Sequence, residues 1–247
     1  FTSPHLVSIN ERIQIDGENI SDADFVWAFE TVKEKFTQHP SFFEVMFAMA
    51  AVYFREKKCD FVVYETGMGG RLDATNVLMP ELSIITSVGM DHMEYLGDTI
   101  EKIAAEKAGI IKPGIPIIYF KRDEAVAKVI EDTARGQKSP VIPVEKQDYI
   151  INHLGDKTID FSLHSRYYSY CNLVIQKTSL YQLENISLAV MAFYGLMKVR
   201  NASEEDIEKG IRETLPEFYW EGRMEEIAPH IYVDGAHNVE AIRAYID

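Results

Sequence analysis

The chain contains two short apolar runs, LSIITSV at residues 82–88 and IPIIYF at residues 115–120. Both are rich in β-branched residues, and their length is typical of buried β-strands. Between them, a helical pattern over residues 99–108 follows two N-cap candidates, Asp98 and Thr99. A strand, a helix and a second strand in this order predict a mostly parallel sheet flanked by helices on both faces, and therefore an α/β fold.

The alternation of strands and helices continues on both sides of this unit. Upstream, the apolar run FVVY predicts a buried strand over residues 59–65. Two helices are predicted before it, one that begins after Ser21 and one that begins after Ser41, where Glu44 completes a Ser-x-x-Glu capping box. Downstream, residues 123–134 predict a further helix.

The pattern changes in the second half of the chain to short apolar segments. They predict strands over residues 141–144, 149–152, 158–163 and 171–176. We expect these strands to form an antiparallel extension of the parallel sheet. Helical periodicity returns over residues 181–198 and 204–214.

The C-terminal part of the chain predicts the start of another domain. A linker-like stretch is followed by a strand over residues 230–233 and by Asp234-Gly-Ala-His-Asn, where a new helix begins. We therefore predict one domain over residues 1–218. Residues 219–247 would form a linker and the first β–α unit of a second, incomplete Rossmann-like domain. Since the chain begins with a phenylalanine and stops inside that helix, we expect that both ends have been cut.

The formal net charge of the 247 residues is −14, which argues against a nucleic-acid-binding surface. An acidic protein can still bind an anion where basic residues gather. Lys107, Lys112, Lys121 and Arg122 are either such a group or ordinary surface residues. No charge-free run is long enough to span a bilayer. We therefore expect a soluble, cytoplasmic protein without a membrane or nucleic-acid partner.

Two polar side chains follow predicted strands, at the edge where an open parallel sheet binds its ligands. Glu65 ends the strand over residues 59–65, and His92 follows the strand over residues 82–88. If the two strands are neighbours, the carboxylate and the imidazole share one rim and can hold a divalent metal ion, although histidine is an unusual ligand for magnesium. The alternatives are an ion pair and a capping contact.

Lys107 lies on the same predicted helical stripe as Ile100, Ile103 and Ala104. On a buried face, a lysine has to extend its amine to solvent, pair with an acid or lose its charge. Extension to solvent is the common outcome. A deprotonated amine is nucleophilic and can be covalently modified, so Lys107 is also a candidate for chemistry.

Two further patterns are compatible with nucleotide binding, and each is weak alone. The turn from Asp234 to Asn238 places an acid, an imidazole and an amide beside free N–H groups that suit a phosphate. Gln182 and Asn185 are one helical turn apart and either read a base edge or are solvated. The sequence has no Gly-x-x-x-x-Gly-Lys-Ser/Thr loop and no Gly-x-Ser-x-Gly elbow. The residues by themselves therefore predict an anion- and metal-binding α/β protein.

Several motifs occur in order along almost the whole chain. They are FTSPHL from Phe1, NERI from Asn10, ETGMGGRLDATN from Glu65, GMDH from Gly89, LG from Leu96, EKAGIIKPG from Glu106, GR from Gly222 and DGAHN from Asp234. Together they resemble the folylpolyglutamate synthases, including their bifunctional dihydrofolate synthase form, in the Mur ligase superfamily. The predicted fold is then a Mur ligase-like ATPase domain without its phosphate-loop segment.

The resemblance implies an ATP-dependent ligase of folate metabolism. ATP would phosphorylate a folate carboxylate, and the amine of L-glutamate would attack the acyl phosphate to form an amide. The implied cofactors are ATP and Mg²⁺, with Mg²⁺ offsetting the phosphate charge. The implied partners are small molecules bound by a monomer: folate (as tetrahydrofolate or dihydropteroate), L-glutamate and ATP.

The resemblance also implies roles for residues at matched positions. Ser3, Glu65 and His92 match metal ligands, so that a cation would pair with Glu65. Lys107 matches a lysine that is carbamylated in the family, which would place an anion near the metal. The loop formed by Thr2, Ser3, Pro4 and His5 would border the pterin.

Three positions match contacts to ATP, and they are Asn185, Arg223 and Asp234. Asp234 and His237 also match catalytic groups that close over ATP and the acyl phosphate. Tyr181 stands where the family usually has histidine, and Glu221 stands where it usually has proline.

The family's phosphate-binding loop is expected before Phe1, and most of its second domain is expected after Asp247. We therefore expect the isolated chain to be inactive. Two alternatives are another Mur-type ligase, which joins an amino acid to a cell-wall nucleotide, and a non-catalytic truncated paralogue that acts as a binding module.

Overall fold

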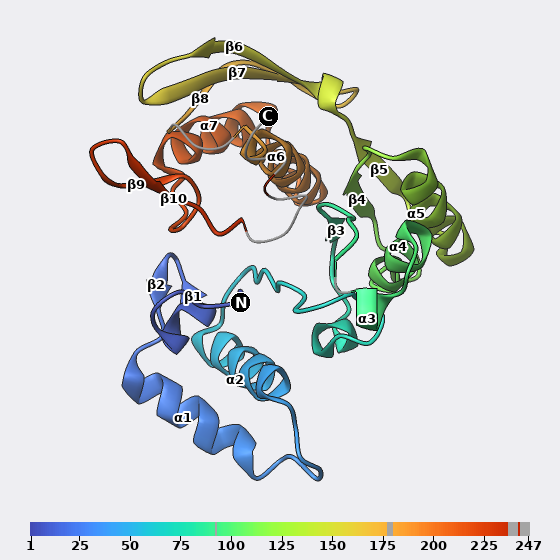
Figure 1. Ribbon diagram of the computed structural model, residues 1–247, viewed down its shortest axis with the longest axis vertical. Coiled ribbons are helices and arrows are strands. Elements are labelled where there is room, and N and C mark those ends of the chain that lie inside the picture. The colour runs from blue at the N-terminus through green and yellow to red at the C-terminus, as the bar shows by residue number, and fades with distance from the viewer. Residues whose placement is uncertain (92, 177–179, 237–241, 243–247) are drawn as a thin grey trace. The chain divides into compact units, whose positions relative to one another are not determined.

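The computed structural model describes residues 1–91, 93–176, 180–236 and 242. The chain divides into two compact units, unit 1 over Phe1–Met79 and unit 2 over Pro80–Asp247, and their elements are labelled in Figure 1. Each unit has its own buried apolar residues, with one cluster in unit 1 and two in unit 2.

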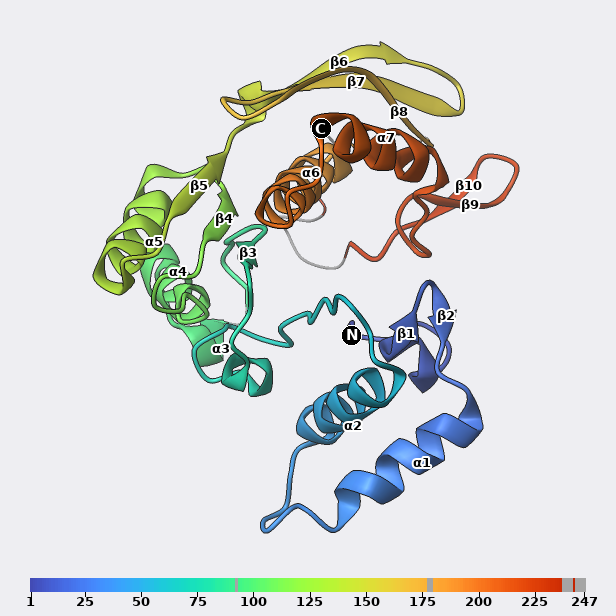
Figure 2. The ribbon, with the colours of Figure 1, turned by 180° about the vertical axis from the view of Figure 1, so that it is seen from behind.

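Unit 1 is built from two helices, a small hairpin and two 3-10 turns. Its elements are η1 (Ile9–Arg12), β1 (Gln14–Ile15), β2 (Glu18–Asn19), α1 (Asp22–Lys33), α2 (Phe42–Lys57) and η2 (Ala74–Val77). The predicted helix starts are confirmed. The Ser21 side chain accepts from Asp24 N, and Ser41 and Glu44 form the reciprocal capping box. In both ribbon views α1 and α2 lie side by side (Figures 1 and 2).

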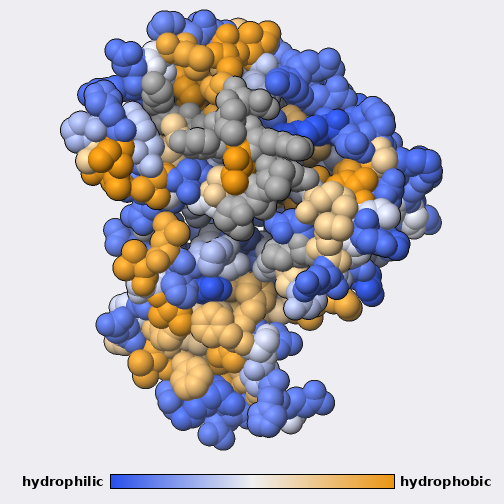
Figure 3. Space-filling view, viewed as in Figure 1, coloured by the Kyte–Doolittle hydropathy of each residue, from blue (hydrophilic) through white to orange (hydrophobic). Residues whose placement is uncertain are grey.

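Aromatic rings fill the core of unit 1. The Phe1 ring centroid lies 5.5 Å from that of Phe43, 6.4 Å from that of Phe47 and 6.3 Å from that of Tyr64. These tilted and edge-on contacts are favourable for aromatic pairs and come in addition to the burial of apolar area. Other apolar side chains of unit 1 stay exposed, such as that of Phe42. Figure 3 shows apolar residues in orange on one face of the molecule.

The buried strand predicted over residues 59–65 is wrong. Residues 61–66 have no assigned secondary structure, and Val63 is 80% exposed. The segment pairs with Phe1 instead: the Phe1 nitrogen donates to Val63 O at 2.8 Å, and Glu65 N donates to Phe1 O at 2.9 Å. An apolar run becomes a strand only beside a partner of sufficient length, and the run itself does not reveal that partner.

Unit 2 contains the predicted parallel sheet. Its strands are β3 (Ser83–Ile85), β4 (Ile117–Phe120) and β5 (Val141–Val144), in the order β3-β4-β5, and its first helices are α3 (Met93–Leu96), α4 (Ile100–Ala108) and α5 (Glu124–Gln137). Alternate residues of β4 point to opposite faces of the sheet. Ile117 and Tyr119 pack with residues of α4 and α5. Ile118 and Phe120 belong to the other apolar cluster of unit 2, which includes residues within 159–163, 170–175 and 183–192.

An antiparallel sheet follows β5. It is formed by β6 (Tyr149–Leu154), β7 (Thr158–His164) and β8 (Ser169–Gln176), and it lies over α6 (Gln182–Val199) and α7 (Glu204–Thr214) in Figures 1 and 2. The predicted antiparallel pairing is therefore confirmed for three of the four strands, but they form a sheet of their own and do not extend the parallel sheet. The prediction is wrong for residues 141–144, because β5 pairs in parallel with β4.

The remaining elements of unit 2 are short. They are η3 (Lys146–Asp148), η4 (Leu215–Glu217), β9 (Glu225–Ala228) and β10 (Ile231–Val233). The strand predicted over residues 230–233 is present as β10, and it pairs with β9 in an antiparallel hairpin. The helix predicted after it lies almost entirely outside the described residues. Within the described ranges, no helix is both long and apolar enough to cross a membrane.

Candidate functional site

The Thr2–His5 loop of unit 1 is fixed to Glu65 by its backbone. Ser3 N donates to Glu65 Oε2 at 2.8 Å, and Thr2 N donates to Arg12 O at 3.0 Å. Two residues that the sequence predicts as metal ligands, Ser3 and Glu65, therefore lie together. A carboxylate that accepts an oriented backbone N–H is held in one position, which suits a ligand that has to meet a charged group.

The carboxylate of Glu11 shapes the chain that follows this loop. It accepts hydrogen bonds from three successive backbone N–H groups, those of Leu6, Val7 and Ser8. The bonds to Ser8 and Leu6 are the main cause of a lowered pKa for Glu11, because they stabilise its charged form. The NERI motif thus determines the local fold around the FTSPHL motif.

Arg12 is buried beside the same loop and is 8% exposed. Its Nε donates to His5 Nδ1 at 2.9 Å, and its guanidinium carbon lies 5.1 Å from the centroid of the Phe42 ring. Burial lowers the pKa of Arg12, and the nearby negative charge of Glu65 partly opposes that effect. Sequence reasoning gave Arg12 no role, since an arginine in a polar turn does not reveal its burial.

Asp73 organises the glycine-rich loop after Glu65. Its Oδ2 accepts from Gly67 N at 2.9 Å and from Met68 N at 3.1 Å, while its Oδ1 accepts from both N and Oγ1 of Thr75. A side chain at Gly67 would meet the Phe43 ring, because an added Cβ would lie 2.7 Å from Phe43 Cε2. The loop is therefore a fixed structure packed on α2, and its glycine at position 67 is required by space.

Lys107 of α4 is half-buried, as the sequence predicts. Burial lowers the pKa of Lys107, and the charge of Asp91, which follows β3, partly opposes the shift. A lowered pKa increases the fraction of neutral amine, which is the form that reacts with electrophiles such as carbon dioxide. His92, the next residue after Asp91, lies outside the described residues.

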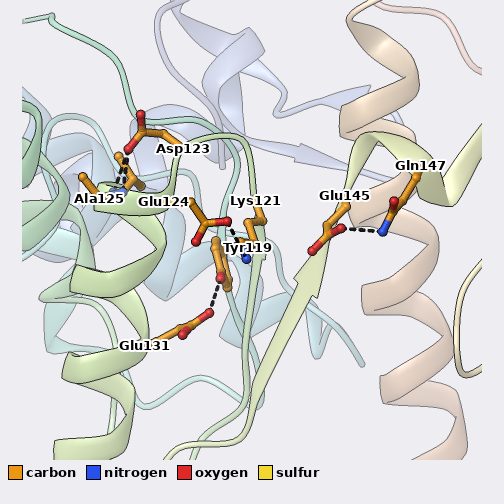
Figure 4. Close-up of polar contacts among 9 residues, drawn as sticks. Tyr119, Lys121, Asp123, Glu124, Ala125, Glu131, Glu145 and Gln147 are labelled. Carbon is orange, nitrogen blue, oxygen red and sulfur yellow. Dashed lines mark hydrogen bonds and ion pairs between the residues drawn. The ribbon is translucent and has the colours of Figure 1, made fainter.

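The basic residues after β4 are paired with acids (Figure 4 shows Lys121). Lys121 Nζ lies 2.9 Å from Glu124 Oε1, and Arg122 forms an ion pair with Glu184 of α6. In the same view the buried Tyr119 donates its hydroxyl to Glu131 at 2.8 Å, and both burial and this bond raise the pKa of Tyr119. Lys121 and Arg122 therefore do not form an open anion site.

The first turn of α6 carries two predicted nucleotide-binding residues. Asn185 is exposed, and its Nδ2 donates to Oε1 of the buried Gln182 at 2.8 Å. This bond leaves the Asn185 amide oxygen as the group that can accept from a ligand. The two residues that the sequence places one turn apart therefore act as one pair.

Asp234 accepts hydrogen bonds from three residues and precedes Gly235, against which Arg223 lies. Its Oδ2 accepts from Met224 N at 3.0 Å and from Tyr181 Oη at 3.2 Å, and its Oδ1 accepts from Ala236 N. Arg223 Nη1 lies against Gly235, where an added Cβ would approach it to 2.1 Å. Since Tyr181 is the N-cap of α6, these contacts bring Asp234 to the helix that carries Asn185. His237, the other residue predicted from this motif, lies outside the described residues.

The described residues supply only part of a metal site. Within them, no group of three or more His, Cys, Asp or Glu side chains is close enough to hold a metal ion. The predicted ligands that are described, the Ser3 hydroxyl and the Glu65 carboxylate, are oxygen donors of the kind that Mg²⁺ prefers. These two oxygen donors therefore fit Mg²⁺, and the third predicted ligand, His92, is not among the described residues.

Comparison with known proteins gives consistent results. Residues 24–202 match the Mur ligase middle domain. The dihydrofolate synthase/folylpolyglutamate synthase of Bacillus subtilis is 38% identical over 98% of this chain, and the folylpolyglutamate synthase of Lacticaseibacillus casei is 31% identical over all of it. The chain spans 58% and 60% of the length of these two relatives.

Solved structures show the same similarity. One described as an FPGS–AMPPCP complex matches the whole chain with a TM-score of 0.90 at 31% identity, over 63% of its own length. The folylpolyglutamate synthase of Thermotoga maritima matches with a TM-score of 0.84 at 34% identity, with 100% of this chain and 58% of that one covered. The chain therefore belongs to the Mur ligase family, in the group of the folylpolyglutamate and dihydrofolate synthases.

Proposed function

We propose that the protein containing this chain is an ATP-dependent ligase that adds L-glutamate to a folate. The observation that carries the proposal is the contact of Ser3 N with Glu65 Oε2, because it joins the FTSPHL motif to the ETGMGG motif at one point. Relatives named as folylpolyglutamate or dihydrofolate synthases match over nearly the whole chain. A folate acceptor is therefore favoured over the cell-wall nucleotide of other Mur-type ligases.

The nucleotide would lie against the residues of unit 2 that the motifs single out. Asn185 offers an amide oxygen, which can accept from the amino group of a base. Arg223 supplies a positive charge. The Asp234 carboxylate is held in place by hydrogen bonds from two backbone N–H groups and from the Tyr181 hydroxyl. Solved structures with AMPPCP or with ADP are among those similar to this chain, which supports ATP as the cofactor.

Mg²⁺ would be held by Ser3 and Glu65, with His92 as the third protein ligand. When bound, the ion would offset the negative charge of the ATP phosphates. The residues of the chain prepare for it: Ser3 N orients the Glu65 carboxylate, and Asp73 holds the glycine loop that follows. The glycines of this loop would let its backbone approach the nucleotide and the substrate.

Lys107 would act as a carbamate. Its lowered pKa favours the neutral amine, which attacks carbon dioxide and loses a proton to give a carbamate anion. Such a change replaces a half-buried positive charge by a negative one that a cation can pair with. His237 and Asp234 would act on ATP and the acyl phosphate, and the Thr2–His5 loop would border the pterin.

An assay of substrate dependence tests the proposed function. The longest natural reading frame that encodes these residues is incubated with ATP, Mg²⁺, L-glutamate and either tetrahydrofolate or dihydropteroate. We expect ADP and a product heavier by one glutamyl residue, in amounts that exceed the enzyme. ADP formation that depends on a cell-wall nucleotide precursor and not on either pteroyl compound would show that the alternative ligase is correct. Binding of pteroyl ligands without any turnover would favour the non-catalytic paralogue.

A further inference from the structure

Arg12 is a buried cation whose hydrogen-bonding capacity is mostly unused. Its guanidinium has five N–H donors, and in the described part of the chain only Nε is engaged, by His5 Nδ1. Neither Nη group donates to a described residue, and Arg12 forms no ion pair with one. The residue as a whole is buried, but neither Nη atom is among the fully buried polar atoms that lack a partner, so this edge of the guanidinium is open to a ligand.

The neighbouring carboxylates do not pair with this edge directly. Glu65 interacts with Arg12 through its charge, but its Oε2 accepts the N–H of Ser3. The carboxylate of Glu11 accepts the three N–H groups of the following turn. The Nη edge of Arg12 is therefore available for an acceptor that the described residues do not provide.

The guanidinium is also held in one orientation. The Phe42 ring stacks on it at 5.1 Å, and the bond from Nε to His5 fixes its rotation. Since the two Nη groups form a planar fork that is already oriented, an oxyanion with two oxygens in one plane can bind with little loss of side-chain entropy. This geometry suits a carboxylate.

His5 extends the same site. An arginine N–H can only donate, so His5 Nδ1 accepts and the ring proton lies on Nε2. His5 then offers one further N–H donor from the Thr2–His5 loop. Arg12 and His5 thus present N–H donors from two neighbouring elements, which is typical of an anion site.

We propose that Arg12, oriented by His5 and Phe42, forms a subsite for the carboxylate of an acidic substrate. This inference rests on the proposed function for the identity of that substrate. The carboxylate belongs either to the pteroyl compound or to L-glutamate, because both carry one.

Binding measurements on the full-length protein test the subsite without turnover. The ligands are pteroic acid and its carboxamide, pteroamide, which differ only in the charge of the group that Arg12 would bind. In Arg12→Met we expect the dissociation constant of pteroic acid to rise about 10-fold or more, as for the loss of a charge-assisted pair, and that of pteroamide to change little. Arg55→Met, which removes an exposed arginine of α2, is the matched control and should change neither value.

Steady-state kinetics separate the two sources of the carboxylate. If Arg12→Met raises the KM of L-glutamate, and pteroic acid binding is unchanged, the subsite holds glutamate. The proposal is overturned if pteroic acid and pteroamide weaken equally, or if only the KM of ATP changes. If Arg12→Met does not fold, Arg12→Lys replaces it in these measurements. Arg12→Lys keeps the charge but not the planar fork, so the preference for pteroic acid over pteroamide should be reduced.

The melting temperature distinguishes a binding role from a structural one. Arg12→Met loses one hydrogen bond to His5 and the contact of the guanidinium with Phe42, so its melting temperature should fall only slightly. A large fall in melting temperature for both Arg12→Met and Arg12→Lys, with unchanged preference for the acid, would contradict the proposal. If the wild type binds pteroic acid through Arg12 but makes no glutamylated product, the proposed function fails and the subsite stands.

Discussion

The backbone N–H of Ser3 donates to Glu65 Oε2 at 2.8 Å, although the two residues are 62 positions apart in the chain. We predict that Glu65→Gln in the full-length protein lowers turnover by about 100-fold or more, as expected for the loss of a ligand to a catalytic metal. Folding should be little changed, because an amide oxygen can still accept the Ser3 N–H. Turnover and the melting temperature are measured together.

Glu56→Gln is the control for this change, since Glu56 is exposed on α2 of the same unit. It removes an equal charge and should leave turnover unaltered. Near-normal turnover in Glu65→Gln would contradict the assignment of Glu65 as a metal ligand.

Asp73 should stabilise unit 1 through four hydrogen bonds that it accepts, two from the glycine loop and two from Thr75. Asp73→Asn replaces one acceptor oxygen by a donor that faces N–H groups, so we expect a loss of about 1–3 kcal/mol in the free energy of unfolding. Urea unfolding at pH 7 measures it. Asp60→Asn, at an exposed position, should lie within about 0.5 kcal/mol of the wild type.

Gly67→Ala tests whether space determines this position. The added Cβ would lie 2.7 Å from the Phe43 ring, so the ring has to move, and we expect a loss of about 1–3 kcal/mol in the free energy of unfolding. The paired substitution Gly67→Ala with Phe43→Leu should lose less than the sum of the two single changes. In contrast, Gly136→Ala in α5 meets no atom within 4 Å and should stabilise the protein by about 0.5–1 kcal/mol.

The lowered pKa of Lys107 predicts a pH-dependent contribution to stability. Because its pKa is lower in the folded state than in the unfolded one, the unfolded chain binds more protons between these two pKa values. Stability attributable to Lys107 therefore rises with pH over that interval and is smallest below the folded pKa. The difference in free energy of unfolding between wild type and Lys107→Met, measured from pH 7 to the ordinary lysine pKa of about 10.4, should rise with pH. A flat difference would contradict a lowered pKa for a free Lys107 amine.

Tyr181→Phe should weaken the nucleotide site. The change removes the hydroxyl that donates to Asp234 Oδ2 at 3.2 Å and keeps the aromatic ring. We expect the KM of ATP to rise by about 10-fold, the effect of losing one hydrogen bond to a charged group, while the KM of L-glutamate stays unchanged. Tyr181→His restores a donor of the residue type usual in the family and should recover part of the loss. Equal effects on both substrates would indicate a general structural defect.

The sequence predicts the helices of this protein well because their signals are local. Ser21 and Ser41 cap α1 and α2 where the side-chain spacing requires it, and Thr99 caps α4. Strand pairing is less accessible, because the partner of a strand is distant in sequence. The run over residues 59–65 therefore reads as a strand although its backbone pairs with Phe1 and has no assigned strand, and β5 reads as antiparallel although it continues the parallel sheet.

The candidate site was predicted in part for the same reason. The motifs point to Glu65, Ser3 and Asp234, whose positions in loops follow from the chain order. Burial, which makes Arg12 notable, and the contact that joins Tyr181 to Asp234 depend on distant segments, and no local pattern contains them.

The alternation of buried faces along β4 limits how this part of the chain can change. Ile117 and Tyr119 face the packing of α4 and α5, and Ile118 and Phe120 face the opposite side. One residue inserted within β4 would exchange the two sides and bring the Tyr119 hydroxyl, now bonded to Glu131, into hydrocarbon. Length variation among relatives is therefore expected in the loops that flank this strand, because an insertion there does not exchange the two buried faces of β4.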